Sequence, residues 1–212
     1  MALIAPHGAN ELRPLIVDDV RRGELEAEAL TLPSLMMSSA AAANAVMMGA
    51  GYFTPLSGYM NRADALSVAE NMRTSDGLFW PVPVVNLTES CPVEAGQRLA
   101  LTDPNREGHP LLAVMTVDAI ETLSDEDVAM ILDKVFRTDH PEHPGVAAFT
   151  AQGRTVISGP IEVLNYSYFE EDFPDTFRTA MAIRSEIAER GWERVVAFQT
   201  RNPMHRAHEE LC

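Results

Sequence analysis

The sequence predicts two kinds of structure in order: a β-rich domain with helices, then the start of an open α/β domain. Short apolar runs separated by Gly and Pro recur up to about residue 165, which is typical of a small β-rich domain. A helical pattern ending at Gly191 is then followed by an apolar run and a second helical pattern, as in an α/β unit. We therefore expect a first domain over residues 1–165. Residues 166–212 should hold a linker helix and the first strand and helix of a second domain.

Composition narrows the classes of function. Of the 212 residues, 46% are hydrophobic and 22% charged, as in ordinary globular proteins. A formal net charge of −15 argues against nucleic-acid binding, which needs a basic surface. We expect no membrane span and no signal peptide, because no apolar run is long enough and residues 1–10 lack an apolar core. The two distant cysteines, Cys91 and Cys212, provide no disulfide framework, so we expect a cytoplasmic location.

Helices in the first domain are predicted from capping residues and apolar patterns. Ser124-Asp-Glu-Asp127 resembles a capping box, and Asn61 suits an N-cap. The methionines beside the alanine-rich run are interpreted as core filling. These are Met36, Met37, Met47 and Met48. The helices are expected over about 17–30, 38–48, 61–73 and 124–137.

Strands are predicted from apolar alternation between turn residues. Residues 155–157 and 161–164 indicate a hairpin around Gly159-Pro160. Residues 52–60 are expected to be a turn-rich loop, which by its residues alone is a plain connector. Further strands are expected at 81–88, 98–102 and 111–120.

Two clusters of polar residues could be interpreted as metal sites, but a structural role is favoured for each. The carboxylates of residues 124–127 suit a helix start, where they favour the helix dipole. His140 and His143 lie among prolines without thiolates or further ligands at a recognisable spacing. We expect them to pack in a loop.

The chain after the first domain begins with an aromatic and acidic linker over 166–174. Asp175 then suits the cap of a helix that runs to about Arg190, and Gly191 suits its end.

The last stretch, residues 194–212, carries the candidate site. Val195 to Phe198 form an apolar run typical of a buried strand. A polar tetrad follows, in which Asn202 suits an N-cap, and a helix is expected over 203–211. The carboxyl end of a strand beside the amino end of a helix is where open α/β sheets bind ligands, and it suits anions.

The side chains of this stretch suit an anion such as phosphate or sulfate. Arg201 can donate two parallel hydrogen bonds to an oxyanion. His205 and His208 are three residues apart, which places them on one helical face. Three neutral donors complete the set: Gln199, Thr200 and Asn202. Each residue alone is usually a surface or packing residue, and zinc binding by the His pair lacks a third ligand. Their convergence on one strand–helix junction favours the anion site.

These residues form a pattern that resembles a known family. Gln-Thr-Arg-Asn-Pro-Met-His-Arg-Ala-His, residues 199–208, resembles the signature of the ATP sulfurylases (sulfate adenylyltransferases), a group of nucleotidylyltransferases. Further segments resemble the same family, in the family's order, across almost the whole chain. They are Gly-Tyr-Phe-Thr-Pro-Leu-Ser-Gly-Tyr-Met (51–60), Asp-Gly-Leu-Phe-Trp-Pro-Val-Pro-Val (76–84), His-Pro-Gly-Val (143–146) and Gly191-Trp192.

The resemblance implies a fold and a reaction. It implies a PUA-like first domain, in which the segment 51–60 forms a structural corner, and the start of a Rossmann-like nucleotidylyltransferase domain. The implied reaction converts ATP and sulfate to adenosine 5′-phosphosulfate and pyrophosphate, or the reverse, in sulfur metabolism and sulfate assimilation. Mg²⁺ would come with the ATP, and a homo-oligomer is implied.

The resemblance also implies residue roles. Gln199 and Arg201 would hold sulfate. Contacts to ATP are expected from Gln199, Thr200, Arg201 and Asn202. Catalytic roles are expected for Thr200, Arg201, Asn202, His205 and His208, the two histidines donating hydrogen bonds to the phosphates.

The sequence departs from the family in one respect. A later Gly-Arg-Asp-His segment, which in the family closes over the nucleotide, is not found. We therefore expect a fragment that is inactive alone. Two alternatives remain open. The chain could be a non-catalytic folding or assembly module, or it could belong to a different nucleotidylyltransferase. Such enzymes usually begin with the nucleotide-binding strand, whereas roughly 190 residues precede it here.

Overall fold

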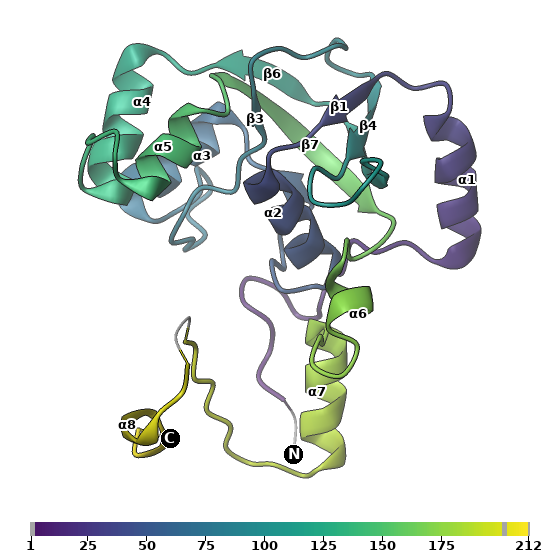
Figure 1. The fold of residues 1–212 in the computed structure, drawn as a ribbon, viewed down its shortest axis with the longest axis vertical. Helices are drawn as coiled ribbons and strands as arrows, with labels where there is room; N and C mark the ends of the chain where they lie inside the picture. The colour runs from purple at the N-terminus through teal and green to yellow at the C-terminus, as the bar shows by residue number, and fades with distance from the viewer. Residues whose placement is uncertain (1–2, 201–202, 212) are drawn as a thin grey trace.

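The computed structural model describes residues 3–200 and 203–211. Within them, seven strands form a curled sheet in the order β1-β4-β5-β7-β2, and β3 and β6 also pair with β7. The strands are β1 (Ser34–Met36), β2 (Gly58–Tyr59), β3 (Leu87–Thr88), β4 (Arg98–Thr102), β5 (Leu111–Thr116), β6 (Ala119–Thr122) and β7 (Thr155–Val163). The strand β7 runs across the centre of the sheet (Figure 1).

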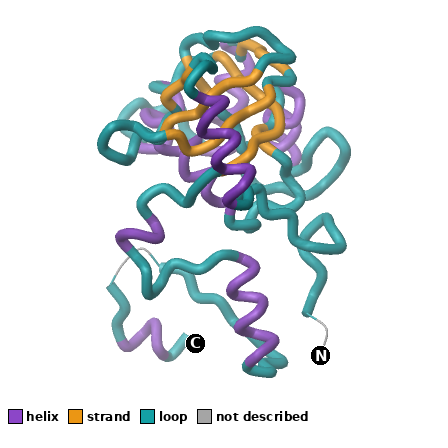
Figure 2. Tube along the Cα trace, turned by 90° about the vertical axis from the view of Figure 1, so that its right-hand side faces the viewer, coloured by secondary structure: helices purple, strands orange, loops and turns teal. Residues whose placement is uncertain are grey.

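Five α-helices accompany the sheet, with a short π-helix after the fourth. They are α1 (Asp19–Ala29), α2 (Ser39–Gly49), α3 (Arg62–Asn71), α4 (Asp125–Ile131), the π-helix (Leu132–Phe136) and α5 (Pro144–Thr150). We call the sheet and α1–α5 together the sheet domain. Three further helices follow it: α6 (Phe169–Asp172), α7 (Ala180–Glu189) and α8 (Arg206–Glu209). They extend away from the sheet domain with the carboxyl-terminal stretch (Figures 1 and 2).

The expected hairpin around Gly159-Pro160 is wrong, because β7 is one continuous strand. Its first half pairs with β6, its second half pairs with β5, and Gly159-Pro160 pairs with β2. Gly159 has a φ of +142°, and an added Cβ would lie 2.1 Å from the backbone oxygen of Thr116. Here Gly therefore marks a bend where other backbone approaches closely, and not a chain reversal.

The other strand predictions have mixed outcomes. The strand at residues 98–102 is confirmed. The strand expected over 111–120 divides into β5 and β6. The strand expected over 81–88 is reduced to the two residues of β3, because Pro81 and Pro83 have no N–H for a ladder.

Helix starts in the sheet domain follow the caps that the sequence predicts. The side chain of Ser38 accepts from Ala41 N at 3.1 Å, and that of Asn61 accepts from Asp64 N at 2.8 Å. The capping box at Ser124 is formed with Asp127. The helix α5 was not predicted, and His143 is its N-cap, accepting from Val146 N at 3.3 Å. His143 therefore caps a helix and is not only a loop residue, and its ring also packs 6.0 Å from that of Phe136.

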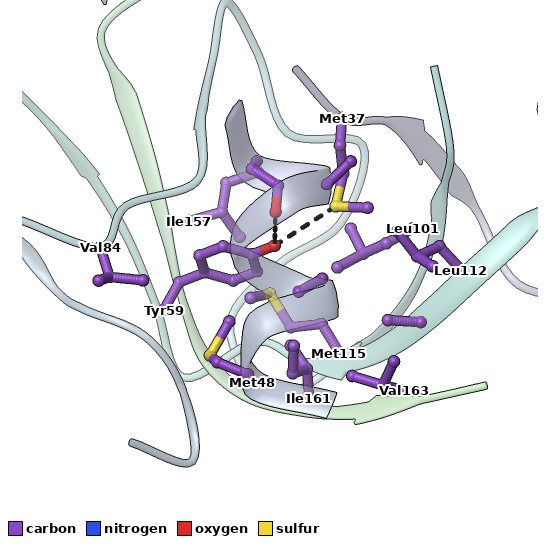
Figure 3. Close-up of a cluster of buried hydrophobic side chains, with 14 of the residues drawn as sticks. Met37, Met48, Tyr59, Val84, Leu101, Leu112, Met115, Ile157, Ile161 and Val163 are labelled. Atoms are coloured by element: carbon purple, nitrogen blue, oxygen red, sulfur yellow. Dashed lines mark hydrogen bonds between the residues drawn. The ribbon is translucent and has the colours of Figure 1, made fainter. Parts of the chain in front are cut away.

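The core lies between α2 and the sheet (Figure 3). Met37 and Met48 are buried there, as expected, but Met36 is exposed. The ring of Tyr59 is also buried, and its hydroxyl donates to the carbonyl oxygen of Ala41 in α2 at 2.6 Å. Burial raises the pKa of Tyr59 far above its ordinary value. The tyrosine thus ties β2 to α2.

The N-cap of α7 lies four residues later than predicted. Its N-cap is Thr179, whose side chain accepts from Ala182 N at 3.1 Å, and not Asp175. The predicted end is confirmed, since Gly191 follows the helix with a φ of +64°. Residues 173–178 instead belong to the segment that joins the sheet domain to α7.

Candidate functional site

The predicted strand at the start of the candidate site is not formed. Residues 194–200 have no regular secondary structure, and Val195 and Val196 are 56% and 74% exposed. A strand requires a neighbour that exchanges backbone hydrogen bonds with it. Among the residues that the structure describes, no strand pairs with this stretch. The apolar residues of the run therefore face solvent.

The helix that follows is shorter than the sequence predicts. It covers Arg206–Glu209, and residues 203–205 precede it in non-helical conformation. Its N-cap is His205, with φ −141° and ψ 173°. The prediction of a helix over 203–211 is therefore wrong in its bounds. The predicted N-cap Asn202 and its neighbour Arg201 lie outside the described residues.

The two histidines of the site lie side by side, although only His208 is in the helix and the predicted shared helical face is not formed. The ring centroids of His205 and His208 are 3.9 Å apart. The backbone N–H of His205 donates to Nδ1 of His208 at 3.2 Å. Since this nitrogen accepts, the neutral ring of His208 carries its proton on Nε2 and keeps that N–H as a donor. The pair can therefore offer imidazole donors to an anion.

The ring of Phe198 packs against His208 of this pair, so the end of the apolar run contacts α8. Its ring centroid lies 5.4 Å from that of His208. Between them, Gln199 is exposed and Thr200 is half-buried. The structure thus brings together Phe198, His205 and His208, but the described residues do not show the polar tetrad converging on one point. Its roles stay predictions.

The charged residues near this stretch are largely paired or exposed. The Arg190 guanidinium lies 4.8 Å from the centre of the Trp192 ring and also pairs with Glu186 at 2.6 Å. Arg206 is exposed, which agrees with the surface role expected for it. Within the described residues, no group of three or more His, Cys, Asp or Glu is placed to hold a metal ion.

One contribution to this region was missed by reasoning from sequence. The segment 51–60 was expected only to form a corner, but the hydroxyl of Tyr52 donates to the backbone oxygen of Arg178 at 2.9 Å, just before α7. The glycine and aromatic residues of the segment indicated a special corner. Nothing in the sequence indicated what the corner contacts.

The described fold is a mixed sheet domain with helices, followed by α6, α7, α8 and the residues that join them. The family model described as PUA-like domain matches residues 4–166, and the model described as ATP-sulfurylase matches residues 174–212. The chain belongs to the PUA-like domain family, and its last residues are similar to the ATP-sulfurylase family.

The relatives agree with this assignment. The chain is 62% identical over 214 residues to the sulfate adenylyltransferase of Alcanivorax borkumensis, a match that covers 100% of the chain and 53% of the relative. It is 60% identical to the sulfate adenylyltransferase of Allochromatium vinosum, covering 99% of the chain and 53% of the relative. The chain therefore spans about half the length of these curated relatives.

A solved structure shares the fold. The hexameric APS kinase from Thiobacillus denitrificans superposes with a TM-score of 0.75 at 29% sequence identity. The match covers 100% of this chain and 36% of that one. Among the described residues, we find no helix that is long and apolar enough to cross a membrane.

Proposed function

We propose that the complete protein is a sulfate adenylyltransferase, which converts ATP and sulfate to adenosine 5′-phosphosulfate and pyrophosphate, or runs the reverse reaction. The observation that carries this proposal is 62% identity along the entire chain to a protein of that name. The stretch at residues 199–208 supplies the residue types that the reaction needs.

The chemistry asks the protein to position two anions. A sulfate oxygen attacks the α-phosphorus of ATP in line, and pyrophosphate leaves. Sulfate is already fully ionised, so no general base is required. Rate acceleration must then come from alignment and from donors aimed at charge that develops on the α-phosphoryl group.

We propose the following roles at this site. Gln199 and Arg201 hold sulfate, the guanidinium by two parallel hydrogen bonds. Thr200 and Asn202 contact ATP near the α-phosphate together with those two residues. His205 and His208 donate to the phosphates, and their 3.9 Å ring separation supports joint action on one group.

Mg²⁺ is proposed to enter bound to ATP and not to be held by side chains of this part of the chain. It is a hard cation that prefers oxygen ligands and bridges phosphates. The described part of the site offers imidazole, amide and hydroxyl groups, which suit phosphate oxygens. It shows no cluster of three or more metal-ligating side chains.

We also propose a homo-oligomer in the cytoplasm that acts on small molecules and not on nucleic acid. The structural neighbour is a hexamer, which supports the proposed homo-oligomer. The free thiol of Cys91 fits a reducing compartment. The net charge of −15 disfavours binding to nucleic-acid phosphates.

The test is product identification by mass spectrometry after incubating the complete protein with ATP, Mg²⁺ and sulfate. Adenosine 5′-phosphosulfate that depends on sulfate supports the proposal. Adenylate transfer to another acceptor, with none to sulfate, would indicate a different nucleotidylyltransferase. No nucleotide chemistry at all would leave the chain as a folding or assembly module.

A further inference from the structure

The segment that joins the sheet domain to α7, residues 165–179, is fixed at both ends. We call it the connecting segment. Its aromatic and acidic composition predicts a linker, and its place between the sheet domain and α7 is visible in Figures 1 and 2. Linkers of this length often leave neighbouring domains free to move. The contacts described next show a different arrangement.

The first end is held by a buried polar pair. Ser167 is 5% exposed and has a φ of +59°, and its hydroxyl donates to a carboxylate oxygen of Asp103, which is 1% exposed. The backbone N–H of Ser167 donates to the side-chain oxygen of Asn165 at 2.9 Å. The amide of Asn165 in turn donates to the carbonyl oxygen of Leu111 in β5, also at 2.9 Å. A buried polar network with its partners in place fixes the local geometry.

Arg106, in the loop between β4 and β5, holds the same end from outside. Its Nη1 donates to the backbone oxygen of Ser167 at 3.2 Å. Its Nη2 donates to both carboxylate oxygens of Glu171 in α6, at 2.7 and 2.8 Å. One side chain therefore links the sheet domain to two points of the connecting segment.

Aromatic rings fold the connecting segment against itself. Phe169 stacks on Tyr168 with ring centroids 4.5 Å apart and lies 5.8 Å from Phe177. Tyr166 lies 5.2 Å from Phe177. Tyr166 and Phe169 also pack against the core of the sheet domain. Such contacts shorten the segment and limit its conformations.

The second end is held at the carboxyl-terminal end of α2. The backbone N–H of Ala180, the first residue of α7, donates to the carbonyl oxygen of Ala50 at 2.9 Å. The hydroxyl of Tyr52 donates to Arg178 O at 2.9 Å. Gly51, with a φ of +82°, lets α7 approach, because an added Cβ would lie 3.2 Å from Sδ of Met181.

We infer that the connecting segment is a rigid strut that sets the direction of α7 relative to the sheet domain. Arg106 is a positioning residue in this arrangement, because it acts on α7 through the connecting segment. The inference does not depend on the proposed function, because the experiment measures the distance between α1 and α7 and not activity.

The test is a distance measurement by pulsed electron paramagnetic resonance on the chain. Nitroxide labels are attached at Ala27→Cys in α1 and Ser185→Cys in α7, both exposed positions. Cys91 and Cys212 are replaced by alanine so that no other thiol reacts. Each variant is compared by its far-UV circular dichroism and its unfolding midpoint. The strut predicts a single narrow distance distribution.

The informative variant is Arg106→Glu, which replaces the contact to Glu171 by repulsion. We expect about a fivefold rise in the fraction of molecules outside the main distance peak. Adding Glu171→Arg should restore most of the narrow distribution, a rescue that a general loss of stability would not give. Glu171→Gln, at a more exposed position, is the second variant if Arg106→Glu does not fold.

The matched control is Arg154→Glu, which breaks an exposed ion pair with Asp125 at the start of α4. It should leave the distance distribution unchanged. A broad distribution in the unaltered chain would overturn the inference. So would a folded Arg106→Glu or Glu171→Gln variant with an unchanged distribution. Either result would leave the proposed activity untouched, since activity is not measured.

Discussion

Gly58→Ala should unfold the corner of the sheet domain that the family-like segment 51–60 forms. Gly58 pairs with Pro160 of β7, and an added Cβ would lie 1.9 Å from the backbone oxygen of Gly159 and 2.8 Å from Cα of Pro160. Both atoms belong to the central strand, so no flexible side chain can move aside. The strand β2 must therefore separate from β7.

The cost follows from two contributions. Overpacking against a well-packed interior costs about 1–3 kcal/mol. Separation also weakens the backbone pairing of β2 with β7, at about 0.5–1.5 kcal/mol for each hydrogen bond lost. We therefore expect the free energy of unfolding to fall by about 2–4 kcal/mol. Urea titration followed by far-UV circular dichroism measures this change.

The matched control is Gly23→Ala, within α1. Here an added Cβ meets no heavy atom within 4 Å. The substitution should stabilise the protein by about 0.5–1 kcal/mol, because Gly is a poor helix former. If Gly58→Ala lowered the free energy of unfolding by less than about 1 kcal/mol, the proposed clash with β7 would be refuted.

Three further predictions concern single side chains. Tyr59→Phe removes the hydroxyl bond to α2 and should cost about 1 kcal/mol in urea unfolding. Because burial raises the pKa of Tyr59, the tyrosine loses its proton at lower pH in the unfolded state than in the folded state. The free energy of unfolding should therefore fall as pH rises above about 10, and this pH dependence should weaken in Tyr59→Phe. Hydrogen bonds from Arg21, opposed by partial burial, hold the pKa of Glu162 below its ordinary value. The ionised Glu162 therefore adds to the free energy of unfolding above the unfolded pKa, and this addition is lost as pH falls through about 4 and lower. Glu162→Gln should flatten the acid side of the curve of stability against pH. An unchanged acid side would contradict this prediction. Ser124→Ala removes the capping box of α4 and should cost about 1 kcal/mol by thermal or urea unfolding, whereas a neutral result would show that the cap contributes nothing.

Local signals predicted much of the sheet domain. Caps such as Ser38, Asn61 and Ser124 determine helix starts through bonds to residues three positions away, and these bonds are visible in the sequence. The strand 98–102 is likewise predicted by its own apolar run. Each of these elements depends on residues that are close together along the chain.

The errors arose where tertiary pairing decides the structure. Gly159-Pro160 has the composition of a turn, but the strand continues because β5 and β6 provide partners on either side of the bend. Conversely, Val195 to Phe198 have the composition of a buried strand, but no described strand pairs with them. Propensity cannot reveal whether a partner strand is present.

The candidate site was predicted in part. His205 and His208 lie side by side, but the predicted placement of both on one helical face is wrong, because His205 is the non-helical N-cap of α8. The start of α8 at Arg206, and the contact of Phe198 with His208, did not follow from helix signals at Asn202 and Pro203. The hydrogen bonds that hold the connecting segment join residues more than 60 positions apart, such as Arg106 and Glu171, and no local sequence pattern could indicate them.

The central claim is that the stretch 199–208 binds sulfate beside ATP. Its most direct test is sulfate-dependent pyrophosphate release by the complete protein carrying Arg201→Ala, compared with Arg206→Ala at the exposed neighbouring arginine. We predict that Arg201→Ala lowers kcat/KM for sulfate by at least about 100-fold, as for loss of a charge-assisted pair worth about 3 kcal/mol, while Arg206→Ala changes it little. Equal activity in the two variants, or pyrophosphate release that does not depend on sulfate, would contradict the claim.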